Sequence, residues 1–335
     1  MAKREEKKKD RKRRLLLLIF LLMFTSLMLI TSTYAWFTSN RAVTVDSIDL
    51  EVTTVNGLQI SANAIEWKAK ITKDELIAAE GYDTAVNQFP DSLSAVSTAG
   101  NLTNGKLDMF LGNVTANETT GEYELTTTKQ TEAHCNGDQG DTACSGKHFV
   151  VFDIFLKADS AFGIVLTSKS GVRTTGDADR GIQNTARVAF LVEGNVAATS
   201  TSAQMQALNN ATRATTKIWE PNYDTHTVEG IAAAKEYYGI TTTSPGSILA
   251  YRGVKEEITT GVPLNETGNT LNTSFAPVTI DIATAADFAD PVEFISLEKG
   301  VTKLRIYWWV EGQDVDAENN ATGTDMRLDL QFEIA

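Results

Sequence analysis

The side chains whose types and spacing best suit a chemical task lie in an acidic segment that follows a pair of tryptophans. Asp314, Asp316 and Glu318 occupy alternate positions there. Alternating carboxylates in a loop offer the oxygen ligands that Ca²⁺ prefers. The EF-hand pattern is absent, because neither its glycine nor its final glutamate stands at the required place. The segment is a candidate calcium site, and the alternative is a solvated acidic turn.

The two tryptophans, Trp308 and Trp309, end an extended apolar run. Neighbouring residues of a strand point to opposite faces of its sheet. We therefore expect one ring in the core. The other ring is either exposed, where it suits stacking on a sugar, or covered by an insertion.

Two cysteines, Cys135 and Cys144, are the candidates for a covalent cross-link. They enclose glycines and polar residues, a composition typical of a loop. Outside the cytoplasm, cysteines this close in sequence favour a local disulfide. The flanking His134 and His148 leave a Cys2His2 metal site as an alternative, although the spacing fits no usual zinc pattern.

The sequence offers little for catalysis. It contains three histidines, and no His-Glu-x-x-His motif, serine nucleophile elbow or phosphate-binding loop occurs. Residues 220–226 bring carboxylates close to a histidine, but Pro221 and Asn222 indicate a turn and no second half of a site follows. We expect that the protein is not an enzyme and needs no cofactor.

The N-terminal segment predicts where the chain is sent. Residues 1–14 hold nine Lys/Arg and three Asp/Glu, and a mainly apolar run of 16 residues, 15–30, follows them. A basic flank stays on the cytoplasmic side, so the chain beyond residue 37 should face outward. The whole chain carries a net charge of -13 despite this basic leader. Its acidic remainder repels nucleic acid, which we exclude as a partner.

A cleavage site is predicted directly after the apolar run. The small residues Thr33 and Ala35 precede Trp36 in the spacing that a signal peptidase reads, which favours cleavage after Ala35. Residues 1–35 are therefore a signal peptide, with signal peptidase as a partner, or a membrane anchor. If the chain is not cleaved, residues 15–37 would hold it in the cytoplasmic membrane.

A period of two dominates the rest of the chain and predicts β-strands. The expected strands are 42–55, 149–156, 162–167, 186–192, 215–219, 276–282, 301–310 and 326–334. Helical patterns occur at 73–80, 202–211, 228–238 and near 283–288, and the Thr-rich and Asn-rich stretches 98–131 and 241–274 suggest long connections or short edge strands. The pattern predicts a mainly β fold: a jelly-roll-like sandwich with long loops and a few short helical insertions, preceded by the N-terminal signal or anchor helix. Residues 36–335 would form this single extracellular domain.

Several segments resemble a known group of proteins. Thr33-Tyr-Ala-Trp-Phe-Thr38, directly after the apolar run, resembles the processing region of Gram-positive proteins handled by SipW-type signal peptidases, a group that contains the TasA and camelysin matrix proteins. The stretch 297–319, with Tyr307-Trp-Trp-Val310, looks like the ending of such surface proteins, and so do the segments 149–156 and 218–222. The resemblance implies a secreted jelly-roll domain, located outside the cell or at its surface, that polymerises when the segment after the cleavage site inserts as a strand into a neighbour.

A donor strand needs an alternating apolar face. The segment after the cleavage site supplies one through Trp36, Phe37, Val43, Val45, Ile48 and Leu50. This strand either completes its own sheet or pairs with a copy of the chain. We therefore expect an exported structural surface or biofilm-matrix protein whose partners are copies of itself. The alternative is a membrane-anchored or shed monomeric adhesin that binds a glycan through its loops.

Overall fold

The computed structural model describes residues 43–54, 57–79, 82, 84–90, 92–121, 123–135, 144–174, 181–232, 252–263, 273–282, 293–317 and 325–335. It shows the mainly β fold with few short helices that the sequence predicts. The expected signal or anchor segment 1–35 lies outside the described residues, and so do Trp36, Phe37 and Glu318. Within the described part of the chain, no helix is long and apolar enough to cross a membrane.

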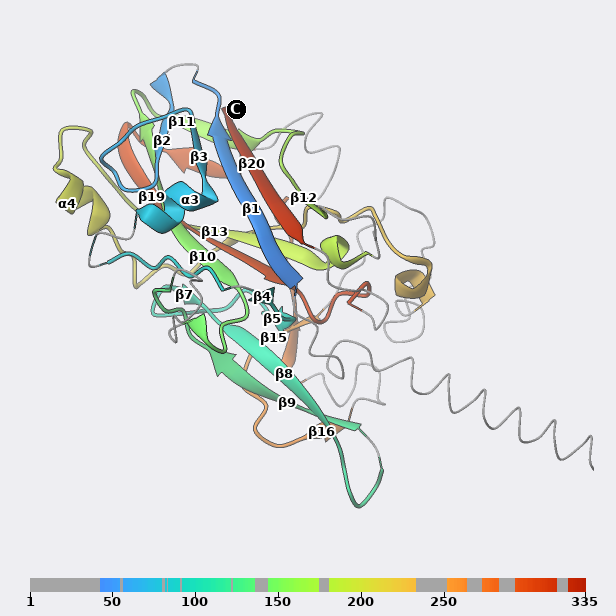
Figure 1. The fold of residues 1–335 in the computed structure, drawn as a ribbon. Helices are drawn as coiled ribbons and strands as arrows, with labels where there is room; N and C mark the ends of the chain where they lie inside the picture. The colour runs from blue at the N-terminus through green and yellow to red at the C-terminus, as the bar shows by residue number, and fades with distance from the viewer. Residues whose placement is uncertain are drawn as a thin grey trace, which may run out of the picture.

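One sheet, here called the β1 sheet, contains the first described strand. Its main path runs β18 (Ile295–Leu297), β11 (Phe162–Leu166), β20 (Met326–Ile334), β1 (Val43–Val52) and β3 (Lys70–Thr72). Two strands lie off this path: β12 (Gly171–Thr174) pairs with β20, and β4 (Ser92–Leu93) pairs with β1. β1 and β20 lie side by side and run parallel, in blue and red in Figure 1.

The second sheet, here called the β19 sheet, is antiparallel between all its neighbours. Its order is β14 (Lys217–Trp219), β13 (Ala186–Val196), β19 (Gly300–Val310), β10 (Val150–Ala158) and β2 (Gln59–Ser61). The three long central strands are rich in β-branched and aromatic residues, which pack well on a pleated surface. All eleven residues of β19 are buried, so this strand is covered on both faces.

The two sheets pack face to face around one large apolar core. Leu50 from β1 and Ile154 from β10 belong to the same buried cluster, although they come from different sheets. The ring of Phe190 in β13 packs edge-on against Phe332 in β20, with centroids 6.2 Å apart. The fold is therefore the jelly-roll-like sandwich that the sequence predicts.

An additional layer covers the other face of the β19 sheet. It contains a sheet of β16 (Val262–Pro263), β9 (Tyr123–Gln130), β8 (Met109–Ala116) and β5 (Val96–Ser97), accompanied by the pairs β6 (Leu102–Thr103) with β7 (Lys106–Leu107) and β15 (Arg252–Val254) with β17 (Phe275–Pro277). Val96 and Met109 of this layer pack in one cluster with Trp309. Both tryptophans are consequently buried, Trp308 between the two sheets and Trp309 beneath the layer.

The hairpin of β8 and β9 differs from the expectation for residues 98–131. Instead of long connections or short edge strands, the structure has two eight-residue strands paired along their whole length. The hairpin points away from the sandwich in Figure 1. Its buried apolar residues are Met109 and Phe110 near the base and Leu125 further along, opposite Val114. Beyond the base, threonine supports the extended backbone without giving an apolar alternation.

The helical insertions are shorter than their sequence patterns. α3 covers Lys73–Ala78, α4 covers Ser202–Gln206, and the 3-10 helix η3 covers Ile182–Thr185. α4 begins with a capping box, in which Gln204 N donates to Thr201 Oγ1 at 3.3 Å and Thr201 N donates to Gln204 Oε1 at 2.9 Å. Residues 228–232 are helical, and the turn expected at 283–288 lies outside the described residues.

Candidate assembly site

β1 presents a continuous apolar face to the core. Its five inward side chains are at most 4 % exposed: Val43, Val45, Ile48, Leu50 and Val52. Burying side chains of this size contributes about 1.5–3 kcal/mol each, hence roughly 7–15 kcal/mol for the five. That sum is comparable with the whole unfolding free energy of a typical domain. The sandwich therefore requires a strand in this position.

We call β20, β3, β4 and Lys73, which hold this strand, the β1 seat. On one side, β20 pairs with β1 from Val45 to Val52, with a bulge directly after Val45. On the other side, β3 pairs with only three residues of β1 and β4 with two. Lys73 Nζ also donates a 2.6 Å hydrogen bond to Val45 O. The strand is thus held mainly by the backbone of β20 and by the core.

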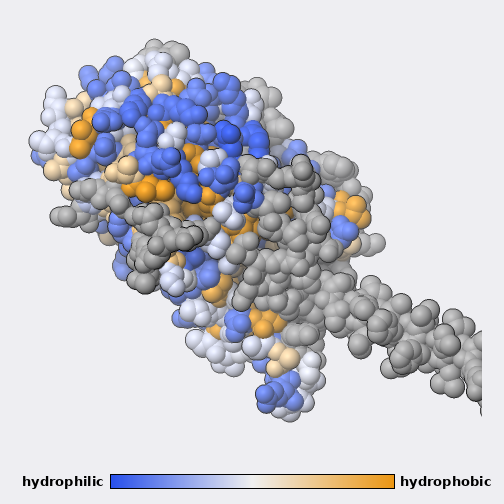
Figure 2. Space-filling view, viewed as in Figure 1, coloured by the Kyte–Doolittle hydropathy of each residue, from blue (hydrophilic) through white to orange (hydrophobic). Residues whose placement is uncertain are grey.

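The outward face of β1 is acidic and carries Asp46, Asp49 and Glu51. Basic side chains of the β1 seat form ion pairs with the central carboxylate, Asp49. Arg327 Nη2 of β20 lies 2.8 Å from Asp49 Oδ2, and Lys70 Nζ of β3 lies 3.2 Å from Asp49 Oδ1. In Figure 2 hydrophilic residues cover this part of the surface. The inward face of β1 is therefore held by apolar burial, and its outward face is held by ion pairs.

The charged network continues across β20 to β12. Arg327 Nε donates to Asp329 Oδ1 at 2.8 Å, and Arg173 Nη1 donates to Asp329 Oδ2 at 2.6 Å. The hydrogen bond to Asp329 raises the pKa of Arg327. Asp49 and Asp329 are direct neighbours across the parallel pair, an arrangement of like charges that is unfavourable unless cations neutralise it. A hollow of about 200 Å³ opens over the network and is lined by Asp49, Glu51, Lys70, Lys169, Arg327, Asp329, Leu330 and Gln331.

The candidate calcium segment lies in a different part of the molecule, after β19. Its two described carboxylates are buried, with Asp314 at 8 % exposure and Asp316 at 0 %. Asp314 Oδ2 is ion-paired with Arg187 Nη2, and Arg187 Nη2 also lies 2.7 Å from Glu220 Oε1. Asp316 Oδ2 lies 2.7 Å from His226 Nδ1. The expectation of a solvated acidic turn was wrong, because these carboxylates bind basic side chains of the protein itself.

Two parts of the sequence that were considered separately meet in this acidic cluster. Residues 220–226, which looked like half of a site, contribute Glu220 and His226, and the segment after β19 contributes Asp314 and Asp316. Each of these groups is buried and bound to an oppositely charged or polar neighbour. Among the His, Cys, Asp and Glu residues that the structure describes, no group of three is placed to hold a metal ion.

Burial controls the titration of this cluster. Desolvation raises the pKa of Glu220 to about 7, although the Arg187 guanidinium opposes the shift. Burial likewise raises the pKa of Asp314, again against Arg187. Glu311, at the end of β19, is fully buried, and desolvation raises its pKa to about 7. Burial thus raises the pKa of Glu220 in this cluster, and of Glu311 at the end of β19, to about 7.

A second buried ionic network lies on the covered face of the β19 sheet. Arg305 of β19 holds Asp153 of β10 through two hydrogen bonds of 2.8 and 3.1 Å, and Lys303 Nζ lies 3.1 Å from the same carboxylate. Arg305 also lies 2.9 Å from Glu132 and 3.5 Å from Glu193. Local sequence patterns do not predict this network. Its one visible signal is Asp153, which interrupts an otherwise apolar strand.

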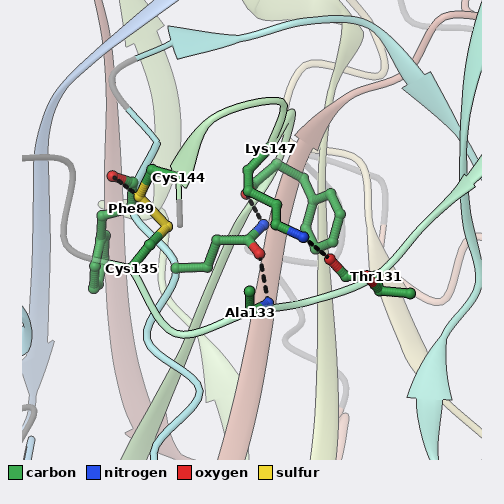
Figure 3. Close-up of a disulfide and its surroundings, with 8 residues drawn as sticks. Phe89, Thr131, Ala133, Cys135, Cys144 and Lys147 are labelled. Carbon is green, nitrogen blue, oxygen red and sulfur yellow. Dashed lines mark hydrogen bonds between the residues drawn. A yellow bond between two sulfur atoms is a disulfide. The ribbon is translucent and has the colours of Figure 1, made fainter. Parts of the chain in front are cut away.

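Cys135 and Cys144 form the disulfide that their spacing predicts, with Cα atoms 5.2 Å apart, as Figure 3 shows. Both sulfurs are therefore bonded, which leaves none for the alternative Cys2His2 site. Cys135 is buried, and its carbonyl accepts a 3.0 Å hydrogen bond from Phe89 N. Gln88, the neighbour of Phe89, pairs with Val151 of β10. The cross-link therefore lies beside a segment that is bound to the β19 sheet.

No family model, curated protein or solved structure matches this chain. The geometry and the charges of the described residues therefore carry the functional interpretation. Of the candidate sites, the charged outer side of the β1 seat reaches the surface, whereas the two ionic clusters are enclosed by the fold.

Proposed function

We propose that this protein is an exported structural component of the cell surface or of a biofilm matrix, and that it assembles by donating β1 to a neighbouring copy. The observation that carries the proposal is the apolar face of β1, which fills the core while main-chain hydrogen bonds join the strand to β20. The same contacts form whether the strand comes from its own chain or from an identical one. The resemblance of residues 33–38 to SipW-processed proteins supports export.

The energetics favour exchange over simple release. An empty β1 seat would expose the core and the backbone edge of β20, at a cost of roughly 7–15 kcal/mol for the apolar contacts alone. A folded chain therefore does not discard its strand into water. A second strand of the same sequence restores every contact, so two chains can trade strands with little change in free energy. Fibres result when each chain donates to the next rather than back to its donor.

A covalent trap tests the exchange. Glu51 on β1 and Gln331 on β20 are direct neighbours across the parallel pair. One chain carries Glu51→Cys, a second carries Gln331→Cys, and the two are refolded together under mild oxidation with the native disulfide intact. A disulfide between positions 51 and 331, identified by mass spectrometry, then requires β1 of one chain to lie beside β20 of the other.

We expect this 51–331 cross-link between chains, and we expect electron microscopy of the unlabelled protein to show filaments. The single chain with both substitutions is the control for geometry, since it forms the bond internally. If the control closes completely while the mixture gives no 51–331 cross-link at any protein concentration, the donation proposal is wrong.

The β8–β9 hairpin favours a second candidate, a monomeric adhesin. Its tip, residues 118–121, is exposed and rich in hydroxyl side chains, and the hairpin extends away from the sandwich in Figure 1. Binding of the intact protein to a glycan array, lost when residues 118–120 are replaced by alanine, would support this role. If the protein binds no glycan on the array, the adhesin role is contradicted and assembly remains the proposed function.

A further inference from the structure

We infer that the outward-facing charges of the β1 seat select the strand that can enter it, and that the selected occupant is the β1 of a second copy of this chain. The inference rests on the proposed function and adds its specificity. The apolar face of β1 does not provide such selection, because alternating aliphatic residues occur in many strands. The charges on the opposite face distinguish one strand from another.

Charge complementarity identifies the occupant. β1 brings three carboxylates, at Asp46, Asp49 and Glu51, and no basic side chain. Around them the β1 seat and its surroundings supply Lys70, Lys73, Arg327 and Lys169: two are ion-paired with Asp49, one donates to the β1 backbone, and Lys169 lines the hollow. An incoming strand thus meets a mainly basic rim, which suits the acidic outward face of an identical β1.

Asp49 is the central element of this recognition. Among the described residues, Lys70 forms an ion pair only with Asp49. The guanidinium of Arg327 forms ion pairs with both Asp49 and Asp329. A neutral residue at position 49 leaves Lys70 without that pair. A basic residue there is repelled by Lys70 and Arg327. Asp329 lies directly across the pair, but Arg327 and Arg173 already neutralise it, so the net repulsion excludes a wrong strand.

The size of the effect follows from the exposure of the groups. Asp49 is 22 % exposed at its side chain, Arg327 42 % and Lys70 51 %, so solvent weakens each pair. Exchanging two such attractions for two repulsions is expected to change occupancy by about tenfold. Because exposed charges are screened, the selectivity should largely disappear in about 1 M salt, where the Debye length is roughly 3 Å.

The trap described above measures this selection between whole chains. The donor chain carries Glu51→Cys with or without Asp49→Lys, and the acceptor chain carries Gln331→Cys with or without Lys70→Glu and Arg327→Glu. Asp49→Asn serves as the neutral control. A single chain with Asp49→Lys, Lys70→Glu and Arg327→Glu has matched charges internally, and its circular dichroism shows whether the reversed charges permit folding.

The native donor should cross-link to the native acceptor, the Asp49→Lys donor about tenfold less, and the same donor should regain its yield with the reversed acceptor. Equal yields for native and Asp49→Lys donors on the native acceptor would overturn the inference while leaving strand donation intact. A native pair that gives no cross-link, beside a control that closes internally, would instead overturn the proposed function on which the inference rests.

Discussion

Glu311 accepts a 3.0 Å hydrogen bond from the indole Nε1 of Trp309, and both side chains are fully buried. The bond satisfies an indole N–H that would otherwise lie unpaired beneath the covering layer. It also places a carboxyl group where its ionisation is costly, because desolvation raises its pKa to about 7. The stability of the protein should therefore depend on pH through this pair.

The sign of that dependence follows from proton binding. Since the pKa of Glu311 rises from 4.5 in the unfolded chain to about 7 in the folded protein, the folded state binds more protons between these values. The free energy of unfolding should fall as pH rises through this interval, by roughly 3 kcal/mol from this group. Glu220 contributes in the same direction.

Glu311→Gln should reduce this decrease in the free energy of unfolding, measured by urea unfolding at pH 5, 6, 7 and 8. The substitution Glu298→Gln, at an exposed position, should not reduce it. An undiminished decrease in Glu311→Gln would show that another group controls it.

Arg187 should be far more costly to remove alone than together with its partners. Arg187→Met leaves Glu220 and Asp314 buried without their guanidinium, so each must stay charged without a partner or bind a proton, which typically costs about 3–5 kcal/mol. Adding Glu220→Gln and Asp314→Asn removes the uncompensated charges and should recover part of the loss. Chemical denaturation of the two variants gives the comparison. If the triple variant is less stable than Arg187→Met, the ion pairs do not account for the cost.

Leu50 should be the most informative truncation in β1. Its side chain is fully buried between the sheets, and Leu→Ala at such a site usually costs about 2–5 kcal/mol because a cavity remains. Thr44→Ala, on the exposed face of the same strand, is the matched control and should change the unfolding free energy by less than about 0.5 kcal/mol. Similar losses for both variants in calorimetry would mean that β1 is not packed as described.

Opening the disulfide should destabilise the protein without changing its fold. Cys135→Ser/Cys144→Ser frees a loop with a sequence separation of 9, for which chain entropy predicts a loss of about 2–3 kcal/mol. Urea unfolding of the variant and of the reduced native protein should agree. A reduced protein that is as stable as the oxidised one would show that the cross-link does not constrain the unfolded chain.

The sandwich strands were largely readable from the sequence. β1 and β20 alternate apolar and polar residues because one face of each packs in the core and the other meets solvent. β10 and β19 were also predicted, although both of their faces are buried, because β-branched and aromatic residues fill them. The disulfide followed from the short spacing of Cys135 and Cys144.

What the sequence did not reveal are contacts between distant segments. Asp153 and Arg305 are 152 residues apart, and no local sequence pattern around either residue predicts that they pair. Asp314 looked solvated because an acidic segment is usually exposed, whereas its partner Arg187 lies 127 residues away. The β8–β9 hairpin escaped recognition because threonine forms strands there without an apolar period.

The parallel pairing of β1 with β20 determines how early β1 can find its partner strand. Asp49 and Arg327 are separated by 278 residues, so β1 has no β20 partner until the residues between them have been synthesised. During that interval the apolar face of β1 is unpaired, and under the proposed exchange it can pair with a neighbouring chain whose own β1 has not yet been bound. If the chain assembles as we propose, the large separation of β1 and β20 along the sequence favours pairing with a neighbour over pairing within the chain.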